Sequence, residues 1–249
     1  MKSRLILTVV MMLSVVSGIE MAEAAKPKSP REATTRKPQP KISKAAEQKA
    51  LRLEHARELL GRHYKKSAVK SGEKISNINS DVYKLVEERL PKRHRKDAKR
   101  VAKAIIEEAQ KHEFDPVFLM SVIQGESSFN PDMVGGVGEL GLMQIRPSTA
   151  KWIAPKFGMK FKQDKTLLDP VTNIQIGAAY LSWLRERFDS HARLYLAAYN
   201  MGQNNVDRAL DKKIWPKDYP VHVMSRYVEF YSYIRDNKRG KNDGKTNKT

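Results

Sequence analysis

The carboxylate of Glu126 stands on the apolar face of a predicted helix. Asp115 followed by proline is a typical helix start, and apolar side chains then recur seven, four and three residues before Glu126, at Leu119, Val122 and Ile123. Residues at this spacing share one side of a helix. Burial there disfavours the ionised carboxylate and raises its pKa, which keeps a proton available near neutral pH. The pattern predicts a general acid, although a glutamate that bends out to solvent or pairs with a lysine also fits it.

The composition gives little support to other catalytic chemistries. The chain has no cysteine, which excludes thiol catalysis, cysteine-ligated zinc, disulfides and a lipid-modified cysteine. Its six histidines are scattered, and no His-Glu-x-x-His pattern occurs. We therefore expect neither a metal nor a cofactor, and the carboxylates remain as the candidate catalytic groups.

Four short motifs begin at Glu126 and follow one another in a fixed order. Residues 125–131 have the sequence GESSFNP, residues 138–145 GELGLMQI and residues 197–202 AAYNMG, and Tyr227 lies in a last aromatic helix. This order and spacing resemble the catalytic domain of the soluble lytic transglycosylases, a lysozyme-like family that acts on peptidoglycan. Each motif alone is weak, but the four together, spread over about residues 100–236, form a specific signal.

The resemblance implies a role for each motif. Glu126 is similar to the catalytic acid/base of the family, and Tyr227 to the phenol that hydrogen-bonds and orients it. The hydroxyl of Ser127 corresponds to a substrate contact. Six further residues correspond to substrate-binding positions, four in the loop that shapes the floor of the sugar cleft and two on the substrate side: Gly141, Leu142, Met143, Gln144, Tyr199 and Asn200.

One carboxylate suffices for the reaction that the resemblance implies. Glu126 protonates the oxygen between N-acetylmuramic acid and N-acetylglucosamine, and once ionised it takes the C6 hydroxyl proton as a 1,6-anhydro ring closes. The alternative is hydrolysis of the same bond, as in goose-type lysozymes, which share much of this core. Hydrolysis needs a second carboxylate in the cleft. Asp132 and Glu139 lie in the segment that follows Glu126 and are candidates for this role. Glu139 stands where the family more often has a small residue. Arg146 could not act as a base.

The elements that must position these groups are almost all predicted helices. Helical patterns start at about residues 97, 116 and 170 and cover five further ranges, and residues 67–80 are predicted to form a loop. The five ranges are 43–64, 81–90, 192–199, 204–210 and 221–236. The glycine-rich residues 134–142 predict at most a small turn or hairpin. The expected fold is therefore all-α and lysozyme-like, with a small β element and a preceding basic arm that is partly helical and partly disordered.

The chain divides into five segments by composition. Residues 1–24 combine a basic start, an apolar run and a small-x-small ending, which is typical of a cleaved signal peptide. Residues 25–42, rich in Lys, Pro, Ser and Thr, predict a disordered linker. Residues 43–95 form a basic helical region that either packs on the catalytic domain or stands apart, residues 96–236 form the lysozyme-like domain, and residues 237–249 form a disordered basic tail. The expected location is the periplasm or the outside of the cell.

The net charge of +19 lies mainly outside the predicted catalytic domain. Residues 25–100 carry 23 Lys and Arg against 9 Asp and Glu, whereas residues 101–236 carry 17 against 16. Such an arm would attract anionic envelope polymers or a membrane surface as well as peptidoglycan strands, so a non-catalytic wall-binding or assembly protein is an alternative. The basic residues within 92–100 could grip phosphates, but an exported protein rarely meets nucleic acid, and we expect no such partner. The sequence predicts no oligomeric state.

Overall fold

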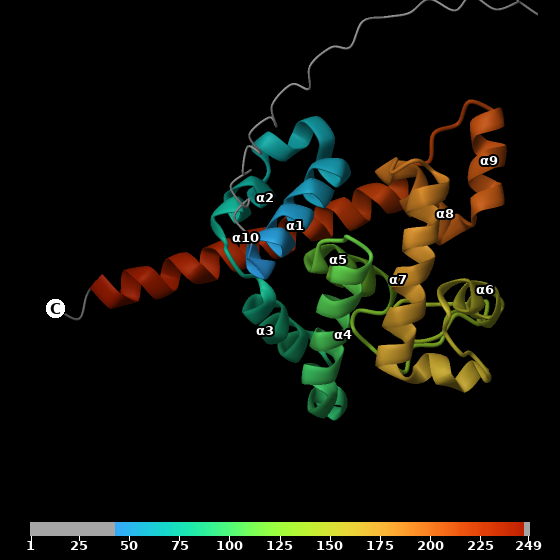
Figure 1. The fold of residues 1–249 in the computed structure, drawn as a ribbon, viewed down its shortest axis with the longest axis horizontal. Helices are drawn as coiled ribbons and strands as arrows, with labels where there is room; N and C mark the ends of the chain where they lie inside the picture. The colour runs from blue at the N-terminus through green and yellow to red at the C-terminus, as the bar shows by residue number, and fades with distance from the viewer. Residues whose placement is uncertain (1–42, 247–249) are drawn as a thin grey trace, which may run out of the picture. The chain divides into compact units, whose positions relative to one another are not determined.

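Helices make up most of the described part of the chain (Figure 1). The computed structural model describes residues 43–246, with side chains to residue 238, so the predicted signal peptide and linker lie outside the described residues. Within that range the α-helices are α1 (Lys44–Leu60), α2 (Ala68–Ser71), α3 (Asn79–Arg89), α4 (Ala98–Lys111), α5 (Pro116–Glu126), α6 (Pro147–Ile153), α7 (Pro170–Arg187), α8 (Ala192–Met201), α9 (Gln203–Asp211) and α10 (Asp218–Thr246). Five 3₁₀ helices connect them: η1 (Gly61–Lys66), η2 (Gly72–Lys74), η3 (Lys92–Asp97), η4 (Ala154–Phe157) and η5 (Asp164–Leu168). The predicted all-α class is confirmed.

Three segments differ from the sequence prediction. Residues 67–80 are not a loop, since they contain α2, η2 and the start of α3, and burial of Val69 and Ile78 holds them against the core. The short helix α6 was not predicted. The helix α10 continues through most of the predicted disordered tail, and Lys238 in this extension pairs with Asp81 of α3 at 2.8 Å.

Asp115 and Asp169 begin α5 and α7, as the sequence predicts. Asp115 Oδ1 accepts a hydrogen bond from the backbone N–H of Val117 at 2.9 Å, and Asp169 Oδ2 accepts one from Thr172 at 2.9 Å. A proline occupies the first helical turn in each case. Because the first N–H groups of a helix have no partner within it, the Asp115 cap, eleven residues before Glu126, fixes where α5 starts.

The helix α5 lies in the centre of the hydrophobic core. All of its residues from Pro116 to Ile123 are buried, and α4 and α10 pack against it. This burial explains why the sequence of α5 lacks a polar face until Gln124. No helix in the described range is both long and apolar enough to span a bilayer.

The N-terminal helical region shares one core with the predicted catalytic domain. On α1, Glu58 accepts hydrogen bonds from Arg185 Nε of α7 at 2.9 and 3.0 Å. The buried His55 accepts the backbone N–H of Asp115 through Nδ1 at 3.0 Å, so its other nitrogen, Nε2, carries the proton and donates it to the Tyr195 hydroxyl at 3.2 Å. Burial, followed by the nearby Arg185, lowers the pKa of His55 well below its usual range. Residues 44–97 therefore pack on the domain and help to set the start of α5.

A buried polar network joins α1, α5 and α10. The hydroxyls of Tyr227 and Tyr231 donate to Asp115 Oδ2 at 2.7 and 2.6 Å. Arg52 of α1 donates to the Tyr231 hydroxyl at 2.9 Å and to the carbonyl of Ile75 at 2.8 Å. Burial raises the pKa of Asp115, although Arg52 and the two phenols oppose that shift. Every member of this network has hydrogen-bond partners, as a buried polar group requires.

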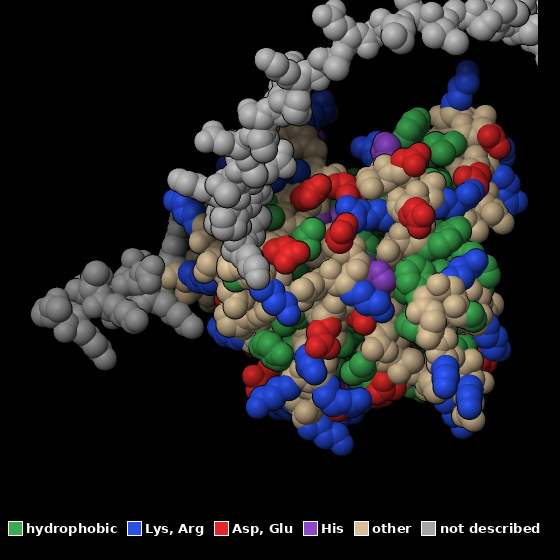
Figure 2. Space-filling view, viewed as in Figure 1, with side chains coloured by type: hydrophobic (Ala, Val, Ile, Leu, Met, Phe, Trp, Pro, Cys, Tyr) green, Lys and Arg blue, Asp and Glu red, His purple; other side chains and the backbone are tan. Residues whose placement is uncertain are grey.

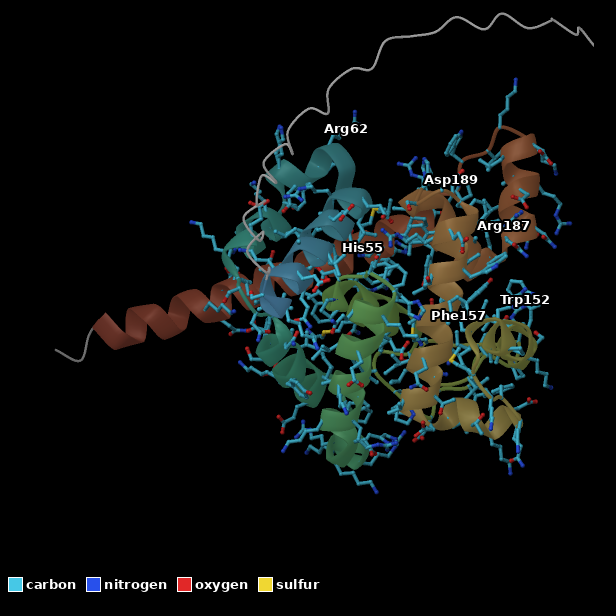
Figure 3. The ribbon with its side chains drawn as sticks, viewed as in Figure 1. His55, Arg62, Trp152, Phe157, Arg187 and Asp189 are labelled. Atoms are coloured by element: carbon cyan, nitrogen blue, oxygen red, sulfur yellow. The ribbon has the colours of Figure 1, made fainter. Side chains whose placement is uncertain are left out.

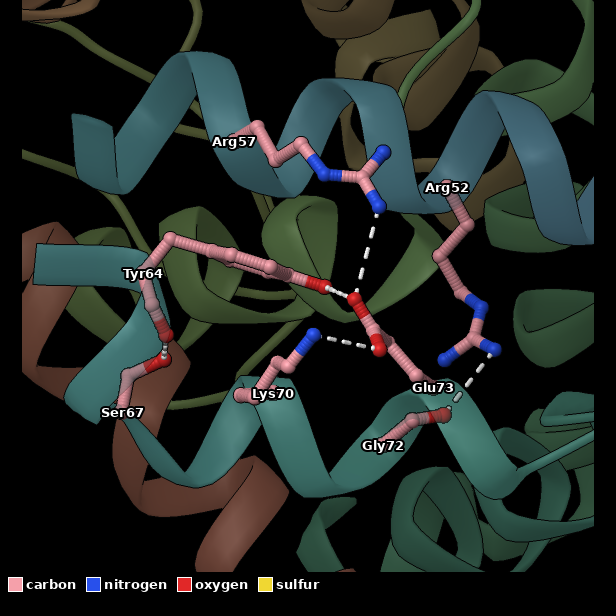
Figure 4. A network of polar contacts seen from close by, with 7 residues as sticks. All are labelled: Arg52, Arg57, Tyr64, Ser67, Lys70, Gly72 and Glu73. Atoms are coloured by element: carbon pink, nitrogen blue, oxygen red, sulfur yellow. Dashed lines mark hydrogen bonds and ion pairs between the residues drawn. The ribbon is translucent and has the colours of Figure 1, made fainter. Parts of the chain in front are cut away.

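A second polar network, around Glu73, ties η2 to α1 and η1 (Figure 4). Glu73 accepts hydrogen bonds from Lys70 Nζ at 2.8 Å and from the Tyr64 hydroxyl at 2.7 Å, and Arg57 lies 3.4 Å away. The bonds from Lys70 and Tyr64 favour the ionised form and lower the pKa of Glu73 from 4.5 to about 2.

Replacement of Glu73 by glutamine tests this network. A folded-state pKa of about 2, below the ordinary 4.5, means that the carboxylate stabilises the fold above pH 4.5 and loses that effect as the pH falls toward 2. Glu73→Gln should therefore lower the melting temperature at pH 7, and the difference from the wild type should shrink to nothing between pH 4.5 and 2. Glu87→Gln, at an exposed position of α3, is the matched control. An equal difference in melting temperature between the wild type and Glu73→Gln at pH 7 and at pH 2 would contradict the account.

Candidate active site

Glu126 lines the wall of a cavity of about 350 Å³. It is the last residue of α5, and its side chain is partly buried. The cavity opens between the end of α5, the loop of residues 135–146, and helices α6, α7 and α8. Its other lining residues are Gly135, Gly136, Glu139, Gln144, Ile145, Arg146, Thr149, Tyr180, Tyr199, Asn200, Met201 and Gly202.

The surroundings of Glu126 favour the protonated carboxyl group. Burial raises its pKa above the usual 4.5, a hydrogen bond from Tyr219 and the charge of Arg226 oppose this shift, and the nearby carboxylate of Glu139 adds to it. The predicted direction is confirmed. Arg226 can come close because the neighbouring residue is glycine, since a Cβ at Gly125 would lie 2.9 Å from the guanidinium Nη1.

The phenol that holds Glu126 is Tyr219, not Tyr227. The Tyr219 hydroxyl, in the first turn of α10, donates to Glu126 Oε1. Tyr227 is fully buried and donates to Asp115 at the opposite end of α5. The reason is geometric: the two helices run antiparallel, and eight residues of α10 span about 12 Å at 1.5 Å per residue. The role predicted for Tyr227 was therefore wrong, and the phenol that fills it stands two turns earlier.

Four of the predicted substrate contacts lie behind the cavity wall rather than on it. Leu142 and Met143 are fully buried. The buried Ser127 hydroxyl donates to the Leu142 carbonyl at 2.7 Å, which fastens the end of α5 to the loop. Gly141, at φ +76°, packs against protein, since a Cβ there would lie 2.4 Å from the Leu167 carbonyl oxygen. These residues support the floor of the cavity from behind rather than lining it, and their contact with substrate stays a prediction.

The other three predicted substrate contacts, Gln144, Tyr199 and Asn200, do line the cavity with Glu126. The Tyr199 hydroxyl donates to the Met143 carbonyl at 2.8 Å. Gln144 Nε2 donates to the Gly141 carbonyl at 2.9 Å, so the loop holds its amide in place. Asn200 is exposed, so its amide group can donate to or accept from a ligand in the cavity.

The predicted small β element is a pair of isolated bridges within the same loop. Val134 and Ile145 each form an antiparallel bridge with Leu140. Gly138, with φ +87°, turns the chain between the bridged positions, a conformation that favours glycine. The turn brings Glu139 and Gln144 to one wall of the cavity.

Of the two carboxylates that could serve hydrolysis, only Glu139 lines the cavity. Asp132 lies at the surface, where His94 and Arg93 hold it at 2.8 and 3.0 Å. Glu139 accepts hydrogen bonds from Arg146 Nε at 3.0 Å and from the backbone N–H of residue 137 at 3.2 Å. Burial opposes ionisation of Glu139, but these bonds outweigh it and lower the pKa of the group. Within the described range, no group of three His, Asp or Glu residues is placed to hold a metal ion.

Comparison with known proteins finds that this region is similar to lytic transglycosylases. Residues 103–221 match the family model called Transglycosylase SLT domain. The soluble lytic murein transglycosylase of Escherichia coli K12 is 33% identical over 121 residues, which are 48% of this chain and 19% of that protein. The membrane-bound lytic murein transglycosylase C of Yersinia enterocolitica is 31% identical over 147 residues, 55% of this chain and 40% of that protein.

The fold is also similar to that of a solved lytic transglycosylase structure. The complex of the 70-kDa soluble lytic transglycosylase with bulgecin A has a TM-score of 0.50 and 25% identity to this chain, and the match covers 78% of this chain and 31% of that one. The resemblance to the lytic transglycosylases that the motifs predict is thus confirmed. The chain spans about a fifth of the length of the Escherichia coli relative. Tyr219 falls within the matched residues 103–221, whereas Tyr227 lies beyond them.

Removal of one hydroxyl at a time separates the two tyrosines. Tyr219→Phe removes a hydrogen bond that favours the ionised form of Glu126, so the pKa of Glu126 should rise further. Tyr227→Phe should leave that pKa unchanged and lower the free energy of unfolding by about 1–2 kcal/mol, because Asp115 loses a buried partner. Carbon-13 NMR titration of the glutamate carboxyls and urea unfolding measure the two effects. A shift of the Glu126 pKa in Tyr227→Phe alone would reverse the assignment.

Proposed function

We propose that the chain is a peptidoglycan lytic transglycosylase that cleaves the β-1,4 bond between N-acetylmuramic acid and N-acetylglucosamine and leaves a 1,6-anhydro end. The observation that carries this proposal is the placement of Glu126 at the wall of a cavity, with a raised pKa and a hydrogen bond from Tyr219. A proton donor for a glycosidic oxygen needs such a group. The similarity of residues 103–221 to the SLT domain supports the choice of substrate.

In the first step, the Glu126 carboxyl group donates its proton to the bridging oxygen. The bond between C1 of the muramic acid and that oxygen breaks, and the N-acetylglucosamine leaves with the proton as a hydroxyl. The acetamido oxygen of the muramic acid bonds to C1 and stabilises its positive charge. Tyr219 and Arg226 favour the carboxylate that remains, which makes the loss of the proton easier at the moment when it is needed.

In the second step, the Glu126 carboxylate takes the proton of the C6 hydroxyl. Oxygen O6 bonds to C1, the acetamido oxygen leaves C1, and the 1,6-anhydro ring closes. Glu126 is protonated again, and no water is consumed. Tyr199, Asn200 and Gln144 lie around the cavity where a sugar would be held, and the amide of Gln144 can both donate to and accept from an acetamido group.

Hydrolysis by Glu139 is the second candidate, because this carboxylate shares the cavity with Glu126. A general base must attract a proton from water, and the bonds from Arg146 and the residue 137 N–H hold Glu139 in its ionised form with a lowered pKa. A carboxylate with a low pKa is a weak base. This environment favours the reaction that needs Glu126 alone.

We propose that the enzyme is exported and acts in the cell envelope, as the sequence predicts. An exported protein with a basic arm would act on the glycan strands of the wall in the periplasm or outside the cell, and the arm would attract anionic envelope polymers or a membrane surface. The named relatives include soluble and membrane-bound murein transglycosylases, which is consistent with work outside the inner membrane.

Digestion of purified sacculi followed by mass spectrometry tests this function. The wild-type protein should release muropeptides with anhydro ends, which weigh one water less than hydrolysed ends. Glu126→Gln keeps the shape and a hydrogen-bond acceptor for Tyr219 but cannot donate an acidic proton, so release should fall by at least about a hundredfold.

Glu139→Gln is the matched control at the other carboxylate of the cavity. It should keep anhydro products and most of the activity. Reducing ends from the wild type, lost in Glu139→Gln, would establish hydrolysis instead. A Glu126→Gln protein that still lysed sacculi would contradict both enzymatic accounts.

A further inference from the structure

A chain of aromatic rings leads away from the cavity to the surface of α6. The ring of Tyr199 lies 5.4 Å from that of Tyr180, and both residues line the cavity. The ring of Tyr180 lies 6.4 Å from that of Trp152. The ring of Trp152 lies 4.6 Å from that of Trp183, with an angle of 81° between the two ring planes. Trp152 lies on α6 at the surface (Figure 3).

Two neighbouring helices continue the cavity wall in the same direction. On α6, Thr149 lines the cavity and Trp152 stands three residues later. On α7, Tyr180 lines the cavity and Trp183 also stands three residues later. Residues three apart lie on the same face of a helix, and α6 packs against α7. Both tryptophans therefore stand one turn beyond the cavity on the faces that form its wall.

Trp152 is too exposed for its place to be explained by the core. It is 40% exposed and does not belong to the buried cluster or to the apolar side chains packed on it. Trp183, by contrast, is partly buried and packs on the core, so it can hold the exposed indole at a fixed angle. Figure 2 shows hydrophobic side chains at the surface between α6 and α9. An exposed indole beside a polar cavity contributes little to the stability of the fold, so ligand binding explains its position better.

We propose that Trp152, supported by Trp183, forms a further saccharide subsite that takes a pyranose ring of the glycan strand beyond those held next to Glu126. This inference rests on the proposed function and names a part of its binding site. The C–H bonds of a pyranose ring pack on an indole because the face of the aromatic ring is negative. The N-acetylated sugars of a glycan strand offer such faces along its length.

Lys156 completes the subsite. Its ammonium group lies 5.1 Å from the centre of the Trp152 ring, and the lysine is exposed. A cation–π contact at an exposed site is weak, so a sugar ring can displace the ammonium group. The displaced lysine stays close enough to hydrogen-bond to the hydroxyl or carbonyl oxygens of the sugar.

Oligosaccharide titration of a cleavage-deficient protein tests the subsite. Glu126→Gln provides the parent, and chitin oligomers of two to six N-acetylglucosamine units are the probe. Affinity in the parent should rise with chain length, and the longest oligomer should bind at least about tenfold more weakly when Trp152→Ala is added, as expected for the loss of one stacking contact. Isothermal titration calorimetry measures this without relying on tryptophan fluorescence. Trp215→Ala, which removes a tryptophan that is 52% exposed near His191, should leave the affinity unchanged.

The outcomes separate the subsite from the enzyme. Equal affinity of the longest oligomer for the parent and for the Trp152→Ala protein would overturn the subsite, while anhydro release from sacculi by the wild type would still support the enzyme. Equal weakening by Trp152→Ala and Trp215→Ala would also overturn it, because the loss would not be local. Absence of wild-type activity on sacculi would instead count against the proposed function. Unfolding in urea at the same midpoint as the parent shows that Trp152→Ala remains folded.

Discussion

The helices α5 and α10 run antiparallel, and each end of this pair holds a carboxyl group away from water. At the start of α5, Asp115 accepts bonds from Tyr227 and Tyr231 and caps the helix. At its end, Glu126 accepts one bond from Tyr219. Burial raises the pKa at both ends, but only Glu126 meets a cavity. Hydrogen bonds to Asp115 thus anchor the helix at one end, while desolvation at the other end favours a protonated Glu126 beside the cavity.

The rest of the fold keeps this pair of helices in place. The N-terminal helix α1 reaches the start of α5 through His55, and Arg52 reaches α10 through Tyr231. The loop after α5 is fastened below the cavity by Ser127 and by Asn173, whose Oδ1 accepts the backbone N–H of Met143 at 2.7 Å. The basic charge of residues 43–95 suggests a separate arm, but these residues pack on the domain and support the site. Most of their Lys and Arg side chains are exposed.

The sequence predicted what depends on local pattern and missed what depends on how helices meet. The caps at Asp115 and Asp169 and the inward side of α5 follow from residue types and spacing, and the structure has them. The phenol at Glu126 was assigned to Tyr227 because the family motif ends there, and only the antiparallel packing of α10 shows that Tyr219 reaches it. Burial of Leu142 and Met143 likewise depends on a tertiary contact. No sequence motif includes Trp152, so its proposed role could not be predicted from the sequence.

The central claim is that Glu126 holds its proton until a glycosidic oxygen arrives, and the most direct test compares two titrations. The pH dependence of kcat/KM for release of anhydro-muropeptides gives the pKa of the essential acid in the free enzyme, and carbon-13 NMR gives the pKa of the Glu126 carboxyl group itself. The account predicts one shared value above 4.5, with activity lost as the pH rises through it. A Glu126 carboxyl that titrates at or below 4.5, or an activity that does not follow it, would contradict the account.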